Sequence, residues 1–229
     1  MKRLFLTILI LTFCATAFAG ESQLKKATNV VNEIMGTPDK GIPDELLERS
    51  VCVGIVPSQV KFALGIGGTY GRGVLVCRKG GNGAWDAPSM FTLGAASVGF
   101  QIGGKATDVV FLVMNPEGMK KLVQDSVKLG AELSVAAGPV GRSAEGATDA
   151  QLHAEILSYS RTRGLFAGAS LDGAVVKQDE EDNQKLYGRK VTAKEILIEG
   201  TVPTPRAAQG LDSALTKHSP KGGESFTRL

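Results

Sequence analysis

Histidine is scarce in this sequence, and its scarcity restricts the chemistry that the chain can support. Only His153 and His218 occur among 229 residues, and His218 lies close to the C-terminal end. A histidine-rich metal site or a serine–histidine–carboxylate triad is therefore not easily assembled. We interpret His153 as a structural residue of a strand. The sequence predicts no catalytic residue, no metal ion and no cofactor, and therefore a protein that is not an enzyme.

The chain also lacks a large excess of charge of either sign. The 26 Lys and Arg residues nearly balance the 23 Asp and Glu residues, which leaves a net charge of +3 at pH 7. Two of these positive charges, Lys2 and Arg3, belong to a segment that we expect to be removed, and +1 then remains. A nearly neutral chain has no overall field that recruits nucleic acid. Nucleic acid is therefore not an expected partner.

An apolar run at residues 4–13 is too short to span a bilayer. It follows two basic residues and precedes Ala-Phe-Ala at residues 17–19, which is the pattern of a secretory signal with its cleavage site. We predict a signal peptide over residues 1–19 and a periplasmic protein that can associate with the membrane. An uncleaved anchor is one alternative. A lipoprotein acylated at Cys14 is another, although bulky Phe13 stands where a small residue is preferred.

Cleavage would leave two cysteines, Cys52 and Cys77, each inside an apolar run that resembles a strand. Export to an oxidising compartment favours a disulfide between them. The alternative is a pair of buried thiols that behave as small hydrophobic side chains. The sequence leaves both possibilities open.

An amphipathic helix is predicted near the start of the mature chain. Apolar residues recur at three- and four-residue spacing after Ser22, a suitable N-cap, and Gly36 ends the pattern. Lys25 and Lys26 lie on the wetter side of this helix.

Three further helices are predicted. Asn115 followed by Pro116 marks a helix start, and the apolar stripe of that helix continues to Val127. Residues 192–198 and 206–215 form two shorter helices near the end of the chain.

Most of the remaining sequence is typical of strands joined by short turns. The connections are too short for the helical crossovers that parallel strands need, so the sheet should be mainly antiparallel. The 29 glycines fall inside apolar runs, where they indicate bends, bulges or close approach of another backbone. The predicted strands are residues 51–56, 62–68, 73–78, 90–104, 107–114, 131–137, 152–160 and 165–176.

These elements predict the α+β class and a single domain over residues 20–215. A strongly curved, mainly antiparallel sheet or a barrel, with flanking helices, accommodates so many strands with internal glycine. Residues 216–229 are polar and glycine-rich and are expected to form a disordered tail.

Three motifs approach ligand-binding patterns without matching them. Residues 99–106 resemble a P-loop, but Ala106 replaces the hydroxyl residue that holds magnesium, and no helix start follows. In residues 65–71, Tyr70 occupies the place of the third glycine of the dinucleotide fingerprint. The acidic run at residues 179–182 lacks the glycine and the distal glutamate of a calcium loop, and we interpret it as a solvated turn.

Basic residues gather in or beside glycine-rich turns, where cations and accessible backbone N–H groups can meet phosphate oxygens. Ordinary solvated strand ends are the alternative interpretation. Trp85, the only tryptophan, either seals one end of the core or contacts lipid. The same two interpretations, core packing and lipid contact, apply to Tyr159 and Phe166. The basic residues are Lys61, Arg72, Arg78, Lys105, Arg161 and Arg163.

The predicted N-terminal helix offers a second possible membrane contact. Its apolar side chains could lie in the lipid interface while Lys25 and Lys26 meet headgroups. Alternatively the apolar face packs on the sheet, as in most amphipathic helices of globular proteins. The apolar side chains concerned are Leu24, Val31, Ile34 and Met35.

Four segments together resemble the SYLF domain, also called the Ysc84 or DUF500 family. They are residues 57–76, residues 85–91 (WDAPSMF), residues 99–108, and residues 158–173 (SYSRTRGLFAGASLDG). The resemblance extends in order over residues 25–215. It implies an α+β fold and a lipid-binding module, with actin binding in some eukaryotic members.

Two functional hypotheses follow. The first is a non-enzymatic lipid-binding module of the bacterial cell envelope whose partners are anionic phospholipids such as phosphatidylglycerol or cardiolipin. The second is a structural or protein-interaction component of the envelope without a lipid ligand. The predicted export argues against actin as a partner of this chain.

Overall fold

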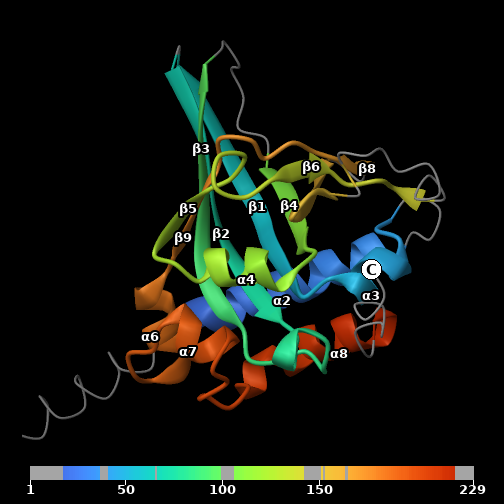
Figure 1. Ribbon diagram of the computed structural model, residues 1–229. Helices are drawn as coiled ribbons and strands as arrows, with labels where there is room; N and C mark the ends of the chain where they lie inside the picture. Colours follow the sequence, from blue (N-terminus) through green and yellow to red (C-terminus); the bar gives the residue numbers. More distant parts are fainter. Residues whose placement is uncertain are drawn as a thin grey trace, which may run out of the picture.

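The structure is a computed structural model (Figure 1). The part of the chain that it describes is built around one sheet. This part comprises residues 18–36, 41–64, 66–98, 106–141, 151, 153–162 and 165–219. The strands are β1 (Cys52–Leu64), β2 (Ile66–Cys77), β3 (Ser89–Val98), β4 (Ala106–Val113), β5 (Ser126–Lys128), β6 (Val135–Ala137), β7 (Ile156–Thr162), β8 (Leu165–Gly168) and β9 (Val175–Gln178).

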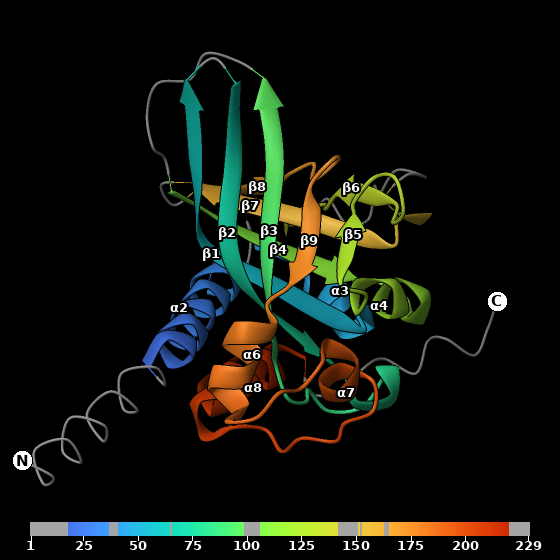
Figure 2. The same ribbon diagram turned by 90° about the vertical axis from the view of Figure 1, so that its left-hand side faces the viewer.

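Helices cover this sheet below and at one end (Figure 2). The α-helices are α2 (Phe18–Met35), α3 (Asp44–Arg49), α4 (Pro116–Leu122), α6 (Glu180–Tyr187), α7 (Ala193–Leu197) and α8 (Gln209–His218). Two short 3₁₀ helices, η1 (Lys79–Gly81) and η3 (Arg206–Ala208), complete the described elements.

The strand order is β5-β9-β3-β2-β1-β4-β7-β6, and β8 pairs with β7 outside this path. The pairs are antiparallel except β6 with β7, which is parallel. Figure 2 shows β4 and β7 crossing the direction of β2 and β3, so the sheet curls strongly into a half-barrel. The predicted α+β class and the strongly curved, mainly antiparallel sheet are confirmed. The described strands do not close the barrel, because β5 and β6 remain its two ends.

The first hairpin is longer than the sequence indicated. Residues 51–78 were expected to form three strands, but β1 and β2 pair along almost their whole length, from Cys52 opposite Cys77 to Leu64 opposite Ile66. The predicted middle strand, residues 62–68, therefore contains the hairpin turn. The glycines at residues 67, 68, 71 and 73 have extended backbone because they pair with neighbouring strands. This pairing outweighs the low strand propensity of glycine, and propensity alone did not reveal it.

The sheet is packed on both faces. On one face α2 and α8 cover Ile55, Val74 and Leu112. On the other face Phe91 and Phe111 form a second core with residues of α4 and α7. A sheet that is buried on both faces explains why its strands are continuously apolar in sequence.

Two strand glycines make room for aromatic rings in this second core. A Cβ at Gly54 would lie 2.1 Å from Cζ of Phe111, its partner in register. A Cβ at Gly73 would lie 2.4 Å from Cζ of Phe91, which is also its register partner. The two rings meet edge to face with centroids 5.6 Å apart. These glycines therefore allow the close approach predicted for glycine inside apolar runs.

The predicted helices are present with shifted limits. The N-terminal helix begins at Phe18, before the expected N-cap Ser22. Asn115 caps α4 as predicted and accepts a hydrogen bond from the backbone N–H of Gly118, but Val127 belongs to β5 rather than to this helix. The last helix, α8, continues to His218.

The ordered fold extends past the predicted boundary at residue 215. Residues 216–218 are helical and Ser219 is fully buried, so a disordered tail from residue 216 is wrong for these four residues. The rest of the predicted tail and nearly all of the predicted leader lie outside the described residues.

The acidic run at residues 179–182 starts a helix instead of forming a solvated turn. The Asp179 carboxylate accepts a hydrogen bond from the backbone N–H of Asp182, and Asp182 itself is buried. Carboxylates in the first turn favour a helix because they offset the positive end of its dipole. The sequence interpretation missed α6 because this segment carries no apolar stripe of helical period.

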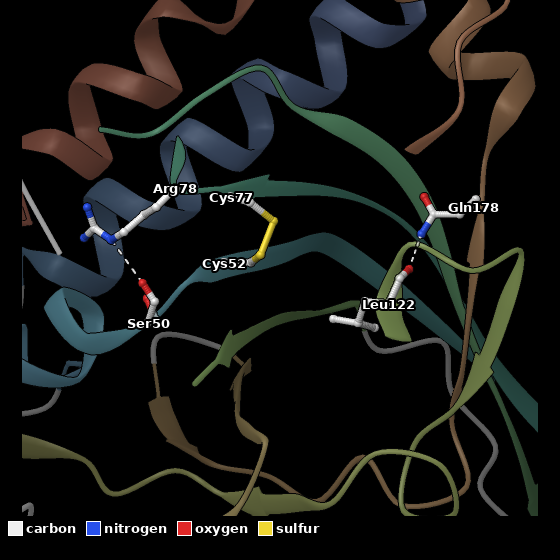
Figure 3. The surroundings of a disulfide bond; sticks show 6 residues. All are labelled: Ser50, Cys52, Cys77, Arg78, Leu122 and Gln178. Atoms are coloured by element: carbon white, nitrogen blue, oxygen red, sulfur yellow. Dashed lines mark hydrogen bonds between the residues drawn. A yellow bond between two sulfur atoms is a disulfide. The ribbon is translucent and has the colours of Figure 1, made fainter. Parts of the chain in front are cut away.

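The disulfide is formed between Cys52 and Cys77, which lie directly opposite each other on β1 and β2 (Figure 3). Both residues are buried in the second core. Of the two alternatives that the sequence left open, the bridge is therefore the one found.

Candidate functional site

The helix α2 packs its apolar face onto the sheet. Leu24, Val31, Ile34 and Met35 are between 0% and 9% exposed and belong to the core that α2 shares with α8 and the sheet. The structure thus has the packed arrangement that was the alternative to lipid insertion. In this fold the four side chains do not face the surroundings, because they form part of the core.

Lys25 and Lys26 remain on the exposed side of α2. Within the described part of the chain, no carboxylate lies within ion-pair distance of either ammonium. Both charges are therefore available to an external anion.

Lys26 lies at the border between the exposed side of α2 and the side that contacts the sheet. Gln23 donates a side-chain hydrogen bond to the carbonyl of Arg72 on β2, and Glu33 pairs with Arg161 on β7. At about 100° per residue, Lys26 projects at an angle between Gln23 and Glu33. Lys25 projects about 100° further round the helix, away from this edge.

Arg161 is engaged by carboxylates. Its Nη2 lies 2.6 Å from Asp108 Oδ2, and Nη1 pairs with Glu33 of α2. The other oxygen of Asp108 accepts a hydrogen bond of 2.8 Å from the backbone N–H of Ser58, at the bulge of β1. This network joins α2, β1, β4 and β7. Arg161 therefore has less capacity for a headgroup than the sequence suggested.

Arg72 also has an internal partner, although it stays exposed. Its Nη1 lies 3.2 Å from Asp182 Oδ2 of α6. A hydrogen bond to the Tyr70 side chain, followed by the charge of Asp182, raises the pKa of the Arg72 guanidinium. The side chain keeps 52% of its surface exposed, so a second anion can still approach it.

The side chains of three other predicted basic residues are not described by the structure. Lys61 lies on β1 opposite Thr69, and nothing is described of its side chain. Lys105 and Arg163 lie outside the described residues.

Arg78 is not a surface cation, contrary to the sequence interpretation. It is 1% exposed, stacks on Trp85, and its guanidinium donates to backbone carbonyls, among them that of Ser50 (Figure 3). Burial lowers the pKa of Arg78 to about 10, and the charge of Glu48 opposes that shift. Trp85 is 5% exposed, so its structural interpretation is the one that this fold supports.

Tyr159 and Phe166 stack on each other with ring centroids 5.3 Å apart. Tyr159 is fully buried, and Phe166 packs against the same core. His153, interpreted from the sequence as a strand residue, has helical backbone ahead of β7.

Sequence reasoning missed one exposed apolar pair. Val60 and Tyr70 lie directly opposite each other on β1 and β2, and their exposed fractions are 51% and 48%. Their alternation was hidden because β1 carries an extra residue between Val56 and Gln59, which reverses the inside–outside pattern beyond it.

An open groove of about 680 Å³ runs from Tyr70 along the sheet to the start of α6. Arg72 and Lys177 supply positive charge on its sheet side. Acidic residues also line the groove, so the groove as a whole has mixed charge. Its acidic residues are Asp125, Asp179, Glu180 and Glu181.

Among the residues that the structure describes, no group of three or more His, Cys, Asp and Glu side chains is placed to hold a metal ion. No helix within the described ranges has the length and apolar character needed to cross a membrane. The expectation of a non-enzymatic protein stays a prediction.

Comparison with known proteins identifies relatives. Residues 94–218 match the Ysc84 family, described as "Las17-binding protein actin regulator". The chain is 36% identical over 200 residues to Protein YSC84 of Saccharomyces cerevisiae, which covers 83% of this chain and 42% of the yeast protein. It is 34% identical over 200 residues to LAS seventeen-binding protein 3 of the same yeast, with 83% and 43% covered.

A human protein is also similar. SH3 domain-containing YSC84-like protein 1 of Homo sapiens is 31% identical over 207 residues, which cover 88% of this chain and 60% of the human protein. The chain therefore spans about half the length of the curated relatives that it matches.

Proposed function

The chain belongs to the Ysc84 (SYLF domain) family, and from this premise we propose that it is a binding module for the anionic lipid surface of a bacterial cell envelope. The proposal concerns lipid headgroups. It does not require α2 to insert into the membrane.

The observation that carries the proposal is the state of Lys25 and Lys26. Both ammonium groups are exposed on a helix whose apolar face is fixed in the core, and neither is neutralised by a described carboxylate. Cations near an anionic membrane contribute about 1 kcal/mol each, and the contribution falls with salt. A rigid helix loses little conformational freedom on docking, which favours such contacts.

The protein-interaction component of the envelope remains the second candidate. The description of the family and the name of one yeast relative refer to Las17 binding, and the name of the human relative refers to an SH3 domain. Because a signal peptide is predicted, we propose a periplasmic location, where neither actin nor its regulators are expected. We therefore propose a lipid ligand and a non-enzymatic role.

Co-sedimentation with vesicles tests the proposal. Residues 20–229 are mixed with vesicles of phosphatidylcholine alone or with phosphatidylglycerol, at low and high salt. We expect binding only to the anionic vesicles and a steep loss with salt. Because each cation contributes about 1 kcal/mol, Lys25→Gln with Lys26→Gln should weaken binding by about tenfold or more.

Two exposed lysines on other elements provide the matched control. Lys128 lies on β5 and Lys190 follows α6. Changing both to Gln removes the same net charge but leaves α2 intact, so binding should stay close to that of the unchanged protein. Equal loss in both double variants would contradict a site on α2. Absence of binding to anionic vesicles at low salt would reject the lipid function and favour the protein-interaction candidate.

A further inference from the structure

Three strands extend beyond their neighbours at one end of the sheet (Figures 1 and 2). The strand β4 pairs with β1 only as far as Val60, and β9 pairs with β3 only as far as Gly94. Beyond this level the described pairing is β1 with β2 and β2 with β3. We call residues 60–64, 66–70 and 94–98 the three-stranded extension.

The base of this extension presents apolar surface. Val60 and Tyr70 are opposite each other in an antiparallel pair, which puts their side chains next to each other on one face. Each is about half exposed. Two other large apolar side chains that are exposed among the described residues, Leu165 and Ile198, lie on different elements.

Charge in the extension has one sign. Residues 60–64, 66–70 and 94–98 contain Lys61 and neither Asp nor Glu, and Arg72, which pairs with Asp182, follows two residues later on β2. The acidic residues of the groove begin only at the level of β9 and α6, beyond the extension. The charge of these strands therefore complements an anionic occupant.

We propose that the three-stranded extension is a membrane wedge that enters the headgroup region of an anionic bilayer. The proposal rests on the proposed lipid-binding function and names the surface that performs it. Val60 and the ring of Tyr70 contact the upper acyl chains, and the Tyr70 hydroxyl stays at headgroup level, where tyrosine is favoured. Arg72 and Lys26 stand at the base of the wedge and face headgroup phosphates.

The open strand edges limit how deep the wedge can go. Beyond Gly94, β3 has no described partner on the side away from β2, and beyond Val60 the same is true of β1. Unpaired backbone groups are costly in hydrocarbon but can be hydrated among headgroups. The extension therefore lies along the interface, with the face that carries Val60 and Tyr70 toward the lipid, and its far end does not enter the hydrocarbon. A shallow apolar contact with flanking cations is the usual arrangement of interfacial binding.

Tryptophan fluorescence can locate the wedge relative to the lipid. Tyr70→Trp places a reporter in the extension, while the native Trp85 stays buried against Arg78 and acts as an internal reference. Vesicles contain phosphatidylglycerol and phosphatidylcholine brominated in the upper acyl chain. We expect the emission of Trp at residue 70 to shift to shorter wavelength and to be quenched at least twofold. Leu165→Trp, on β8, should show neither change.

Charge substitution supplies the second measurement. Val60→Asp with Tyr70→Asp should reduce binding to anionic vesicles at least tenfold, whereas Leu165→Asp should leave it unchanged. The three side chains are 51%, 48% and 74% exposed, so the fold should survive, and near-ultraviolet circular dichroism checks it.

The outcomes separate the wedge from the lipid function. If the protein sediments with anionic vesicles but only the Leu165→Trp reporter is quenched, the wedge is wrong and the lipid function stands. If no protein sediments with those vesicles, the lipid function fails and the wedge fails with it. If the Asp variants abolish a concentration-dependent dimer but not vesicle binding, the exposed edges serve pairing between copies, and the wedge is overturned.

Discussion

The guanidinium carbon of Arg78 lies 3.9 Å from the centroid of the Trp85 ring, and both side chains bind Ser219. Trp85 Nε1 donates to the Ser219 carbonyl over 3.1 Å, and Arg78 donates to the same carbonyl and to the hydroxyl. Arg78 also donates to the carbonyls of Ser50 and Gly83. One buried arginine therefore fastens the end of α8 to the start of β1 and to the loop after β2.

Replacing this arginine should destabilise the fold strongly. Arg78→Met retains apolar volume but leaves the carbonyls of Ser50 and Gly83 without this donor, while the Ser219 carbonyl keeps only its bond from Trp85. Buried acceptors without partners are costly, so we expect a loss of about 3 kcal/mol in the free energy of unfolding, measured with urea. Arg189→Ala, at an exposed position, should change it by less than about 0.5 kcal/mol. Equal effects of the two changes would contradict the anchoring role of Arg78.

A methyl group at Gly54 should also destabilise the protein. The Cβ of Gly54→Ala would meet Phe111 Cζ at 2.1 Å, and the neighbouring Phe91 ring restricts the movement of Phe111. Overpacking of this kind costs about 1–3 kcal/mol, which a shift in the urea midpoint reports. Gly94→Ala is the matched strand control, because its Cβ would meet only the Thr69 carbonyl at 3.7 Å. Phe111→Leu should partly rescue Gly54→Ala, and failure of both expectations would show that the ring is free to move.

Local sequence signals were sufficient for the fold class and for several helix limits. Asn115 with Pro116 marked a helix start that the structure has, and short connections indicated antiparallel strands. The hairpin of β1 and β2 was divided wrongly because glycines at residues 67, 68, 71 and 73 look like turns in isolation. Their extended conformation depends on pairing with β3, and no local signal reports that contact.

The disulfide makes a prediction about stability. The bridge joins residues 25 positions apart, and loop closure of this size contributes about 3 kcal/mol by the chain-entropy model. Reduction, or Cys52→Ala with Cys77→Ala, should lower the free energy of unfolding by about that amount. Thiol titration of unfolded, unreduced residues 20–229 should detect no thiol, and two reactive thiols there would exclude the bridge.

Candidate site residues were harder to predict than the fold. A basic residue in the sequence does not show what neutralises it: Arg161 meets Asp108, which lies 53 residues away, whereas Lys26 meets no described carboxylate. Arg78 looked like a turn cation although it is buried. The pair Val60 and Tyr70 depends on the bulge in β1, which shifts the strand by one residue. Each outcome was decided by long-range contacts.

The predicted leader can be tested on the exported protein. Mass spectrometry of the periplasmic fraction should give a chain that starts at Gly20. Cleavage there removes only Phe18 and Ala19 from α2 and leaves its buried face, from Leu24 onward, intact. The mature chain should therefore keep the Tm of the full chain. An intact leader, or lipid on Cys14, would contradict the prediction.

Alkaline pH should unfold the protein through Tyr159, which is fully buried, and Tyr187, which is partly buried. Burial raises the pKa of Tyr159, and burial together with the charge of Asp86 raises the pKa of Tyr187. The hydroxyl of Tyr187 donates to the Pro88 carbonyl, which also requires the protonated form.

The sign of the pH effect follows from proton linkage. The unfolded chain loses its tyrosine protons near pH 10, whereas the folded chain retains both of these. The unfolded state therefore binds fewer protons above that pH, and the free energy of unfolding falls as the pH rises. Arg78 acts in the opposite direction, because its lowered pKa makes the folded chain release a proton first. One arginine opposes two tyrosines, so the net effect of rising pH is to lower the free energy of unfolding.

Absorbance at about 295 nm, where phenolate absorbs, measures the ionisation, and circular dichroism measures unfolding at the same pH. In a Tyr70→Phe background only Tyr159 and Tyr187 remain, since the chain has three tyrosines. Their phenolate signal should appear together with unfolding and should rise at lower pH when urea is added, because urea populates the state that ionises. Tyr159→Phe should shift the alkaline midpoint upward because one of the two linked groups is gone. Phenolate absorbance that develops while the circular dichroism stays native would show that these hydroxyls reach solvent in the folded protein.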